Sequence, residues 1–139
     1  MLTKPALALQ EALWLALTSD PVLPTLIGSP PRVYDQPPPE VVFPYLTIGE
    51  TRLRALDGIP GAIEHDLRLH AWSRYEGRAE VKEIMSAVYD ILQDAPLNVT
   101  GARLVCLRYV FGDIFQKADA ETFHAVMRYR AVTEPVHIP

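Results

Sequence analysis

Histidines are the side chains of this 139-residue chain best suited to metal binding or acid–base chemistry, and there are four: His65, His70, His124 and His137. None belongs to an HxH, HExxH or Cys/His pattern, the spacings that gather several ligands around one metal ion. His65 and His70 lie in a segment of strand-like alternation, where a separation of five residues puts two side chains on opposite faces. The sequence therefore predicts structural or surface roles for the histidines and no metal site.

Glu64 and Asp66 form a second pair, and their spacing is compatible with acid–base catalysis. Two residues apart on a strand, they share one face at a separation of about 7 Å. Paired carboxylates at such distances carry out acid–base catalysis in glycosidases. Arg68 follows on the same face, so ion pairs with neighbouring strands are the better explanation.

Nucleophiles with a supporting base are not evident. Cys106 is the single cysteine and lies in the apolar run 104–107, which is typical of a small buried side chain. Ser73, Ser86 and Thr100 lack the Gly-x-Ser-x-Gly context of a hydrolase nucleophile. No phosphate-binding or dinucleotide-binding glycine loop is present either, so the sequence predicts no enzymatic activity and no cofactor.

Composition sets bounds on the kind of protein. A length of 139 residues suits one domain, and 49% apolar with 22% charged residues is ordinary for a soluble globular protein. The net charge of −4 argues against tight binding to duplex DNA, which depends on neutralising phosphates with Lys and Arg. The arginines within 52–78 and 128–130 are therefore expected to pair with acidic side chains of neighbouring strands or subunits.

No targeting or membrane-spanning segment is evident. The apolar run Ala6–Leu17 is interrupted by Gln10 and Glu11, is too short to span a bilayer, and is not followed by an Ala-x-Ala cleavage pattern. The sequence therefore predicts a cytoplasmic protein with no membrane association.

Hydrophobic periodicity predicts the elements that position these side chains. Two main helices are expected over 5–18 and 77–94, and a short one over 22–27. Strands are expected at four places, with a short extra edge over 32–34: 45–53, 62–72, 102–111 and 123–134. Short breaks between consecutive strands favour hairpins. We therefore expect one α+β domain over residues 1–139, an antiparallel sheet of about four strands with two main helices packed on one face.

The strand over 62–72 has the strongest alternation. One face is predicted to be buried and carries Ile63, His65, Leu67, Leu69 and Ala71. The other carries Glu64, Asp66, Arg68, His70 and Trp72. This second face is expected to be solvated in a monomer or partly buried in an assembly.

A proline-rich arm over 29–44 contains six of the thirteen prolines. The run Pro37-Pro38-Pro39 must be extended, because each proline restrains its own φ and disfavours helix in the residue before it. Two interpretations stay open: a rigid surface connection, or a contact arm for a neighbouring subunit.

Four stretches, in this order, carry a family resemblance. They are the N-terminal helix followed by Arg32–Asp35 and prolines, Pro44–Gly49 (PYLTIG), His65–Ser73 (HDLRLHAWS) with the helix after it, and His124–Arg130 (HAVMRYR). Together they resemble the small tail-completion or tail-terminator proteins found in head–tail gene clusters of siphophages and gene transfer agents. The resemblance spans nearly the whole chain.

The resemblance implies a structural role without catalysis or cofactor. Members of that family have an α+β fold and form a six-fold ring at the head-proximal end of the tail tube. The ring ends tube growth and meets the head-completion (stopper) protein, and DNA passes through its lumen without specific binding. The implied partners are further copies of this chain, the tail tube protein and the head-completion protein. The implied location is the tail or neck of a virion assembled in the bacterial cytoplasm.

A closed ring needs two different patches that meet on neighbouring subunits. We expect these at the arm and on the outer strand face, with Pro37, Pro38, Pro39, Arg68, His70 and Trp72 as the candidate interface residues. Alternatives that the sequence leaves open are another head–tail connector position, such as head-completion or tube subunit, and a small enzyme or ligand-binding domain with a pocket on the sheet.

Overall fold

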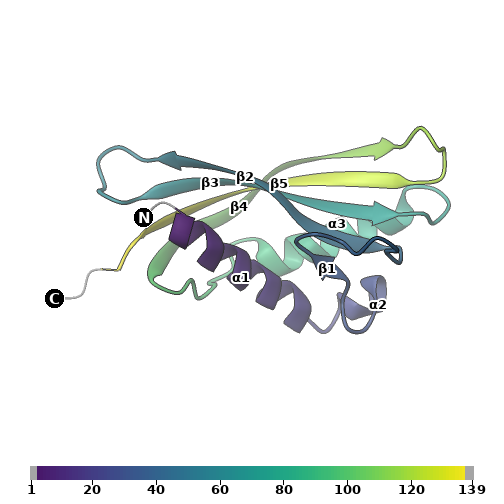
Figure 1. The fold of residues 1–139 in the computed structure, drawn as a ribbon, viewed down its shortest axis with the longest axis horizontal. Helices are drawn as coiled ribbons and strands as arrows, with labels where there is room; N and C mark the ends of the chain where they lie inside the picture. Colours follow the sequence, from purple (N-terminus) through teal and green to yellow (C-terminus); the bar gives the residue numbers. More distant parts are fainter. Residues whose placement is uncertain (1–2, 137–139) are drawn as a thin grey trace.

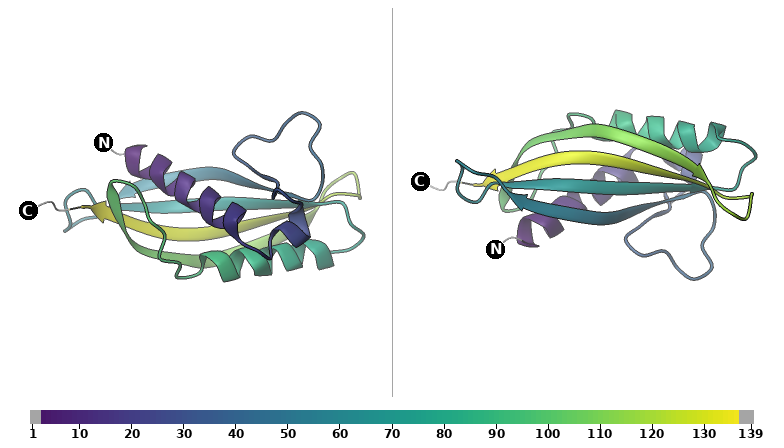
Figure 2. Two further views of the ribbon diagram at one scale, coloured as in Figure 1. Left: turned by 90° about the horizontal axis from the view of Figure 1, so that it is seen from below. Right: turned by 90° about the horizontal axis from the view of Figure 1, so that it is seen from above.

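A computed structural model describes residues 3–136 and shows two layers, a twisted sheet and helices on one of its faces (Figure 1). The main helices α1 (Thr3–Ser19) and α3 (Ala79–Leu92) lie side by side on that face, and α2 (Pro24–Ile27) follows α1 (Figure 2). The predicted α+β fold with two main helices on one face is confirmed. His137, for which a structural or surface role is expected, lies outside the described residues.

Five strands form the sheet, in the order β1-β2-β3-β5-β4. Their bounds are β1 Val33–Tyr34, β2 Tyr45–Ala55, β3 Ile63–Ser73, β4 Ala102–Gln116 and β5 Phe123–Pro135. The β2–β3 and β4–β5 pairs are the predicted hairpins, and β3 pairs antiparallel with β5 across the connection that contains α3.

The expected four-stranded antiparallel sheet is correct for β2 to β5 but incomplete. The short strand β1 pairs parallel with β2, with Val33 opposite Leu46 and Tyr34 opposite Thr47, so the sheet is mixed and has five strands. Parallel neighbours need a connection long enough to carry the chain back to the start of the next strand. Residues 35–44, between β1 and β2, provide it, and we call them the arm loop.

Strand β4 is longer than the sequence predicts, ending at Gln116 instead of Phe111. Its register against β5 shifts between Leu104 and Cys106 and again between Tyr109 and Phe111. Each bulge inserts a residue and resets the alternation of faces. The period of two therefore breaks twice along β4, which hides the continuation of the strand.

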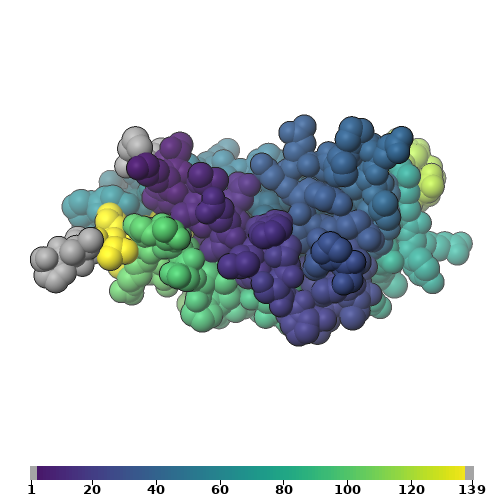
Figure 3. Space-filling model, turned by 60° about the horizontal axis from the view of Figure 1, so that its bottom comes forward, coloured from purple at the N-terminus to yellow at the C-terminus, as the bar shows by residue number. Residues whose placement is uncertain are grey.

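The core lies between the sheet and the helices. The buried positions of α1 are Leu9, Leu13 and Leu17, and those of α3 include Val81, Ile84, Val88 and Leu92. They pack against the inner residues of β3 and β5, which are almost fully buried. Burying one such aliphatic side chain stabilises the fold by about 1.5–3 kcal/mol. In space-filling view, α1 and the chain that follows it form a continuous cover on this side (Figure 3).

Among the described residues, the opposite face of the sheet carries no helix, as the right-hand view in Figure 2 shows. The arm loop stands out beyond the β2 side of the sheet in both views of that figure. At the other side of the sheet, β4 is the edge strand. We call the helix-free face the outer face.

Candidate subunit interface

Arg68, His70 and Trp72 occupy the outer face of β3, as the alternation predicts. Leu69 and Ala71 between them are fully buried, whereas the three candidates are half-buried. The remaining candidates, Pro37, Pro38 and Pro39, lie apart from them in the arm loop. The structure therefore gathers the β3 candidates into one patch and places the proline candidates on the loop beside the sheet.

Trp72 belongs to a line of rings that crosses the sheet, which we call the aromatic row: Tyr45, Trp72, His124 and Phe115. They come from β2, β3, β5 and β4 and are cross-strand partners in turn. The ring centroids of Trp72 and His124 lie 3.7 Å apart with planes only 5° from parallel. Tyr45 stacks on the other side of Trp72 at 6.0 Å. Such pairs add about 0.5–1.5 kcal/mol beyond the area they bury.

Two histidines that the sequence treats separately meet beside this row. His70 Nδ1 lies 2.7 Å from His124 Nε2, and His70 Nε2 lies 2.7 Å from a carboxylate oxygen of Glu50. The ionised carboxylate of Glu50 can only accept, so His70 donates to it from Nε2, and the direction of the His70–His124 hydrogen bond follows from the tautomers of the two rings. Burial, followed by the charges of His70 and Lys117, lowers the pKa of His124 to about 4.

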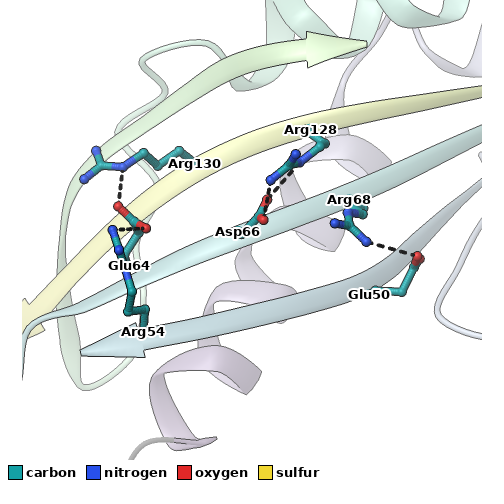
Figure 4. A network of polar contacts seen from close by, with 7 residues as sticks. All are labelled: Glu50, Arg54, Glu64, Asp66, Arg68, Arg128 and Arg130. Carbon is teal, nitrogen blue, oxygen red and sulfur yellow. Dashed lines mark hydrogen bonds and ion pairs between the residues drawn. The ribbon is translucent and has the colours of Figure 1, made fainter. Parts of the chain in front are cut away.

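Beyond the aromatic row, ion pairs connect β2, β3 and β5 on the outer face (Figure 4). Glu64 accepts hydrogen bonds from Arg54 at 2.9 Å and from Arg130 at 2.6 Å. Asp66 pairs with Arg128. The Arg130 hydrogen bond is the largest of the influences that lower the pKa of Glu64. The ion-pair explanation for Glu64 and Asp66 is therefore confirmed.

The arm loop is tied to the sheet at its C-terminal end. Arg32 Nε donates to the carbonyl oxygen of Pro44 at 2.9 Å. Phe43 packs edge-on against Tyr45 at 5.1 Å, and the guanidinium of Arg74 lies 4.1 Å from the centre of the Phe43 ring. Phe43 thereby joins the arm loop to the aromatic row.

A metal centre, a pocket and a membrane span are the other kinds of site to consider in this fold. Between residues 3 and 136, no three His, Cys, Asp or Glu side chains are grouped so that they could hold a metal ion. A mainly apolar hollow of about 660 Å³ lies at the β2–β3 loop. It is lined by residues 55–63, the first turn of α1, the start of β4 and the end of β5. No helix in the described part of the chain has the length and apolarity needed to cross a bilayer.

Comparison with known proteins decides the family. The sequence profile of tail completion protein gp17 matches residues 11–134. The chain belongs to the tail completion protein gp17 family. Among solved structures, a chain of "Virion of native gene transfer agent (GTA) particle" is similar, with 29% sequence identity and a TM-score of 0.85 over 93% of this chain and 96% of that chain. No curated protein matches the sequence.

Membership of the gp17 family confirms the resemblance and makes the protein a structural component of the tail region of a phage-like particle. Both the family and the similar structure are virion components.

Three members of the outer-face patch of this gp17-family protein are not predicted by the sequence: Tyr45, His124 and Phe115. Alternation places His124 on the same face of β5 as Arg128, and this pattern could have predicted that His124 lies on the outer face. It does not say that β3 lies next to β5, or that His124 is opposite Trp72.

Proposed function

We propose that this protein forms a ring at the head-proximal end of the tail tube, where it ends tube polymerisation and joins the tail to the head. The observation that carries the proposal is the family match over residues 11–134. The near-complete mutual coverage with a chain from a gene transfer agent virion supports it and favours a particle of that kind.

The proposed partners are further copies of this chain in a six-fold ring, the tail tube protein and the head-completion protein. DNA passes through the lumen, and the net charge of −4 disfavours tight binding of its phosphates. The role needs no catalysis and no cofactor. Assembly takes place in the bacterial cytoplasm, before the finished virion leaves the cell.

The proposed ring contact uses the two patches described above. A head-to-tail contact requires unlike surfaces on each subunit. The outer face offers Arg68, His70 and Trp72 in one half-buried patch, and the arm loop offers Pro38 and Pro39 as exposed, conformationally restrained residues. The outer-face patch sits on the sheet and prolines restrain the backbone of the arm loop, so little conformational entropy is lost when the two patches meet.

Deletion of the gene in the producing cell tests this function. We expect electron microscopy to show overlong or headless tails, because nothing would stop tube growth or present a surface to the head. Complementation with the intact gene should restore normal particles. Normal particles without the gene would contradict the proposal, and long filaments formed by the purified protein alone would indicate a tube subunit instead.

A further inference from the structure

The aromatic row has two unlike ends. At the β2 end it continues through Phe43 into the arm loop. At the β4 end it stops at Phe115, whose side chain is 50% exposed. The row therefore starts at a projecting loop and ends at an open edge on the opposite side of the sheet.

The β4 edge has the features of a surface that another chain covers. It is 15 residues long, and no further strand pairs with it within residues 3–136. Its exposed apolar side chains are Val105, Val110, Phe111 and Phe115. Long edges with apolar side chains invite pairing with another chain unless they are protected, and apolar patches of this kind commonly mark interaction sites.

The arm loop has the complementary chemistry. Pro37 and Pro38 each precede a proline, which restrains them toward an extended conformation, and Pro39 begins a turn. Extended proline segments bind exposed aromatic rings at low entropic cost. Val42 adds an apolar side chain that is 60% exposed. The loop carries two acidic and no basic residues, whereas segment 102–117 carries three basic and one acidic.

Lys117 makes this charge difference specific. Arg103 and Arg108 already pair with Glu134 and Asp94 of the same subunit. Among residues 3–136, Lys117 has no ion-pair partner, and its ammonium lies over the aromatic row, 5.1 Å from the centre of the Trp72 ring. An acidic neighbour that reaches the row from the β4 side would therefore meet a positive charge without an ionic partner.

The register of the strands is compatible with a closed ring of subunits. Tyr45, beside the arm loop, and Phe115, on the open edge, belong to one cross-strand line and so lie at the same level along the strands. If neighbouring subunits are related by a rotation about an axis parallel to the strands, the arm-loop end of the row in one subunit can meet the β4 end of the row in the next. A head-to-tail contact made by rotation alone closes into a ring, whereas one with a translation makes a filament.

We infer that the arm loop of one subunit packs on the β4 edge of its neighbour, with its proline run on the Phe111 and Phe115 rings and an acidic side chain near Lys117. The occupant of the β4 edge is thus a second copy of this chain. This inference rests on the proposed ring function and extends the outer-face partner of the arm loop from Arg68, His70 and Trp72 to the adjoining β4 edge.

Cross-linking in assembled particles tests the contact. Two single-cysteine chains are co-produced on a Cys106→Ser background, one carrying Glu40→Cys in the arm loop and the other Asp113→Cys on β4, so that Phe115 stays intact. A short bis-maleimide should join them into a covalent dimer, which can only form between subunits. The matched control replaces Asp113→Cys with Ser86→Cys, an exposed position on α3, and should give no comparable dimer.

Phe115→Ser provides a second measurement. We expect its incorporation into particles, relative to the tail tube protein, to fall at least about tenfold, the effect of losing one aromatic anchor. Tyr89→Ser, which removes an exposed ring from α3, should incorporate normally. Circular dichroism of each variant checks that it is folded.

The outcomes separate the two proposals. If the protein is present in particles but Glu40→Cys cross-links to Ser86→Cys as well as to Asp113→Cys, or to neither, the arm-to-edge contact is wrong. The ring function would still stand. Intact protein absent from otherwise normal particles overturns the ring function, and the contact with it.

Discussion

At the scale of single residues, Tyr129 buries a hydroxyl group, and this lowers the stability of the folded protein. The side chain is 0% exposed, and its hydroxyl has no hydrogen-bond partner among residues 3–136. Burial also raises the pKa of this phenol. An unsatisfied buried hydroxyl costs about 1–3 kcal/mol, so we expect Tyr129→Phe to raise the free energy of unfolding by about 1 kcal/mol in urea titrations.

Tyr109→Phe is the matched control. Tyr109 packs edge-on against Tyr129 at 5.4 Å but is only partly buried, so its hydroxyl can reach water. Its removal should change stability little. A loss of stability in Tyr129→Phe would mean that the hydroxyl is satisfied, for example by an internal water molecule.

At the scale of elements, the β2–β3 hairpin depends on two glycines in left-handed conformation. Gly58 has φ of +91° with open space around it, and Gly61 has φ of +80° with the Pro135 ring 2.5 Å from where a Cβ would stand. A left-handed non-glycine residue costs about 1–2 kcal/mol. We expect Gly58→Ala to show that cost in thermal or urea unfolding, and Gly61→Ala to show a larger one.

The difference in destabilisation between Gly58→Ala and Gly61→Ala measures the contact between the hairpin and the end of β5. Both substitutions introduce the same backbone strain, and only Gly61→Ala must also displace Pro135. Equal destabilisation would mean that the end of β5 yields freely and does not anchor the hairpin.

At the scale of the whole molecule, two histidines couple stability to pH. Burial lowers the pKa of His65, and the pKa of His124 is about 4 in the folded protein against about 6.5 in an unfolded chain. Between these values the unfolded chain binds protons that the folded protein does not, so the free energy of unfolding falls as pH drops from about 6.5 toward 4.

His124→Phe tests this dependence while keeping a ring beside Trp72. We expect the urea midpoint of the variant to fall less than that of the original protein between pH 7.5 and pH 5. Carboxylates with lowered pKa, such as Glu50 and Glu64, add a further loss only below about pH 4.5. Parallel curves for the two proteins down to pH 5 would show that His124 titrates normally.

The sequence by itself determined the local elements and the faces of β3. Periodicity identifies α1, α3 and the two hairpins, and it places Arg68, His70 and Trp72 opposite the buried Leu67 and Leu69. These features follow from side chains close together in the chain, because the helical and strand periods assign each residue to a face. The family resemblance rested on the same local motifs in order, and it was confirmed.

Only the tertiary structure decided which side chains meet across strands. His70 and His124 are 54 residues apart, and Trp72 stacks on His124 because β3 pairs with β5 in one register. The parallel pairing of β1 and the two bulges of β4 are likewise properties of strand pairs. The period within one strand assigns each residue to a face, and it restricts the register because a one-residue slip would exchange the faces. It does not identify which distant strand is the neighbour, and that is decided by the packing of the whole sheet.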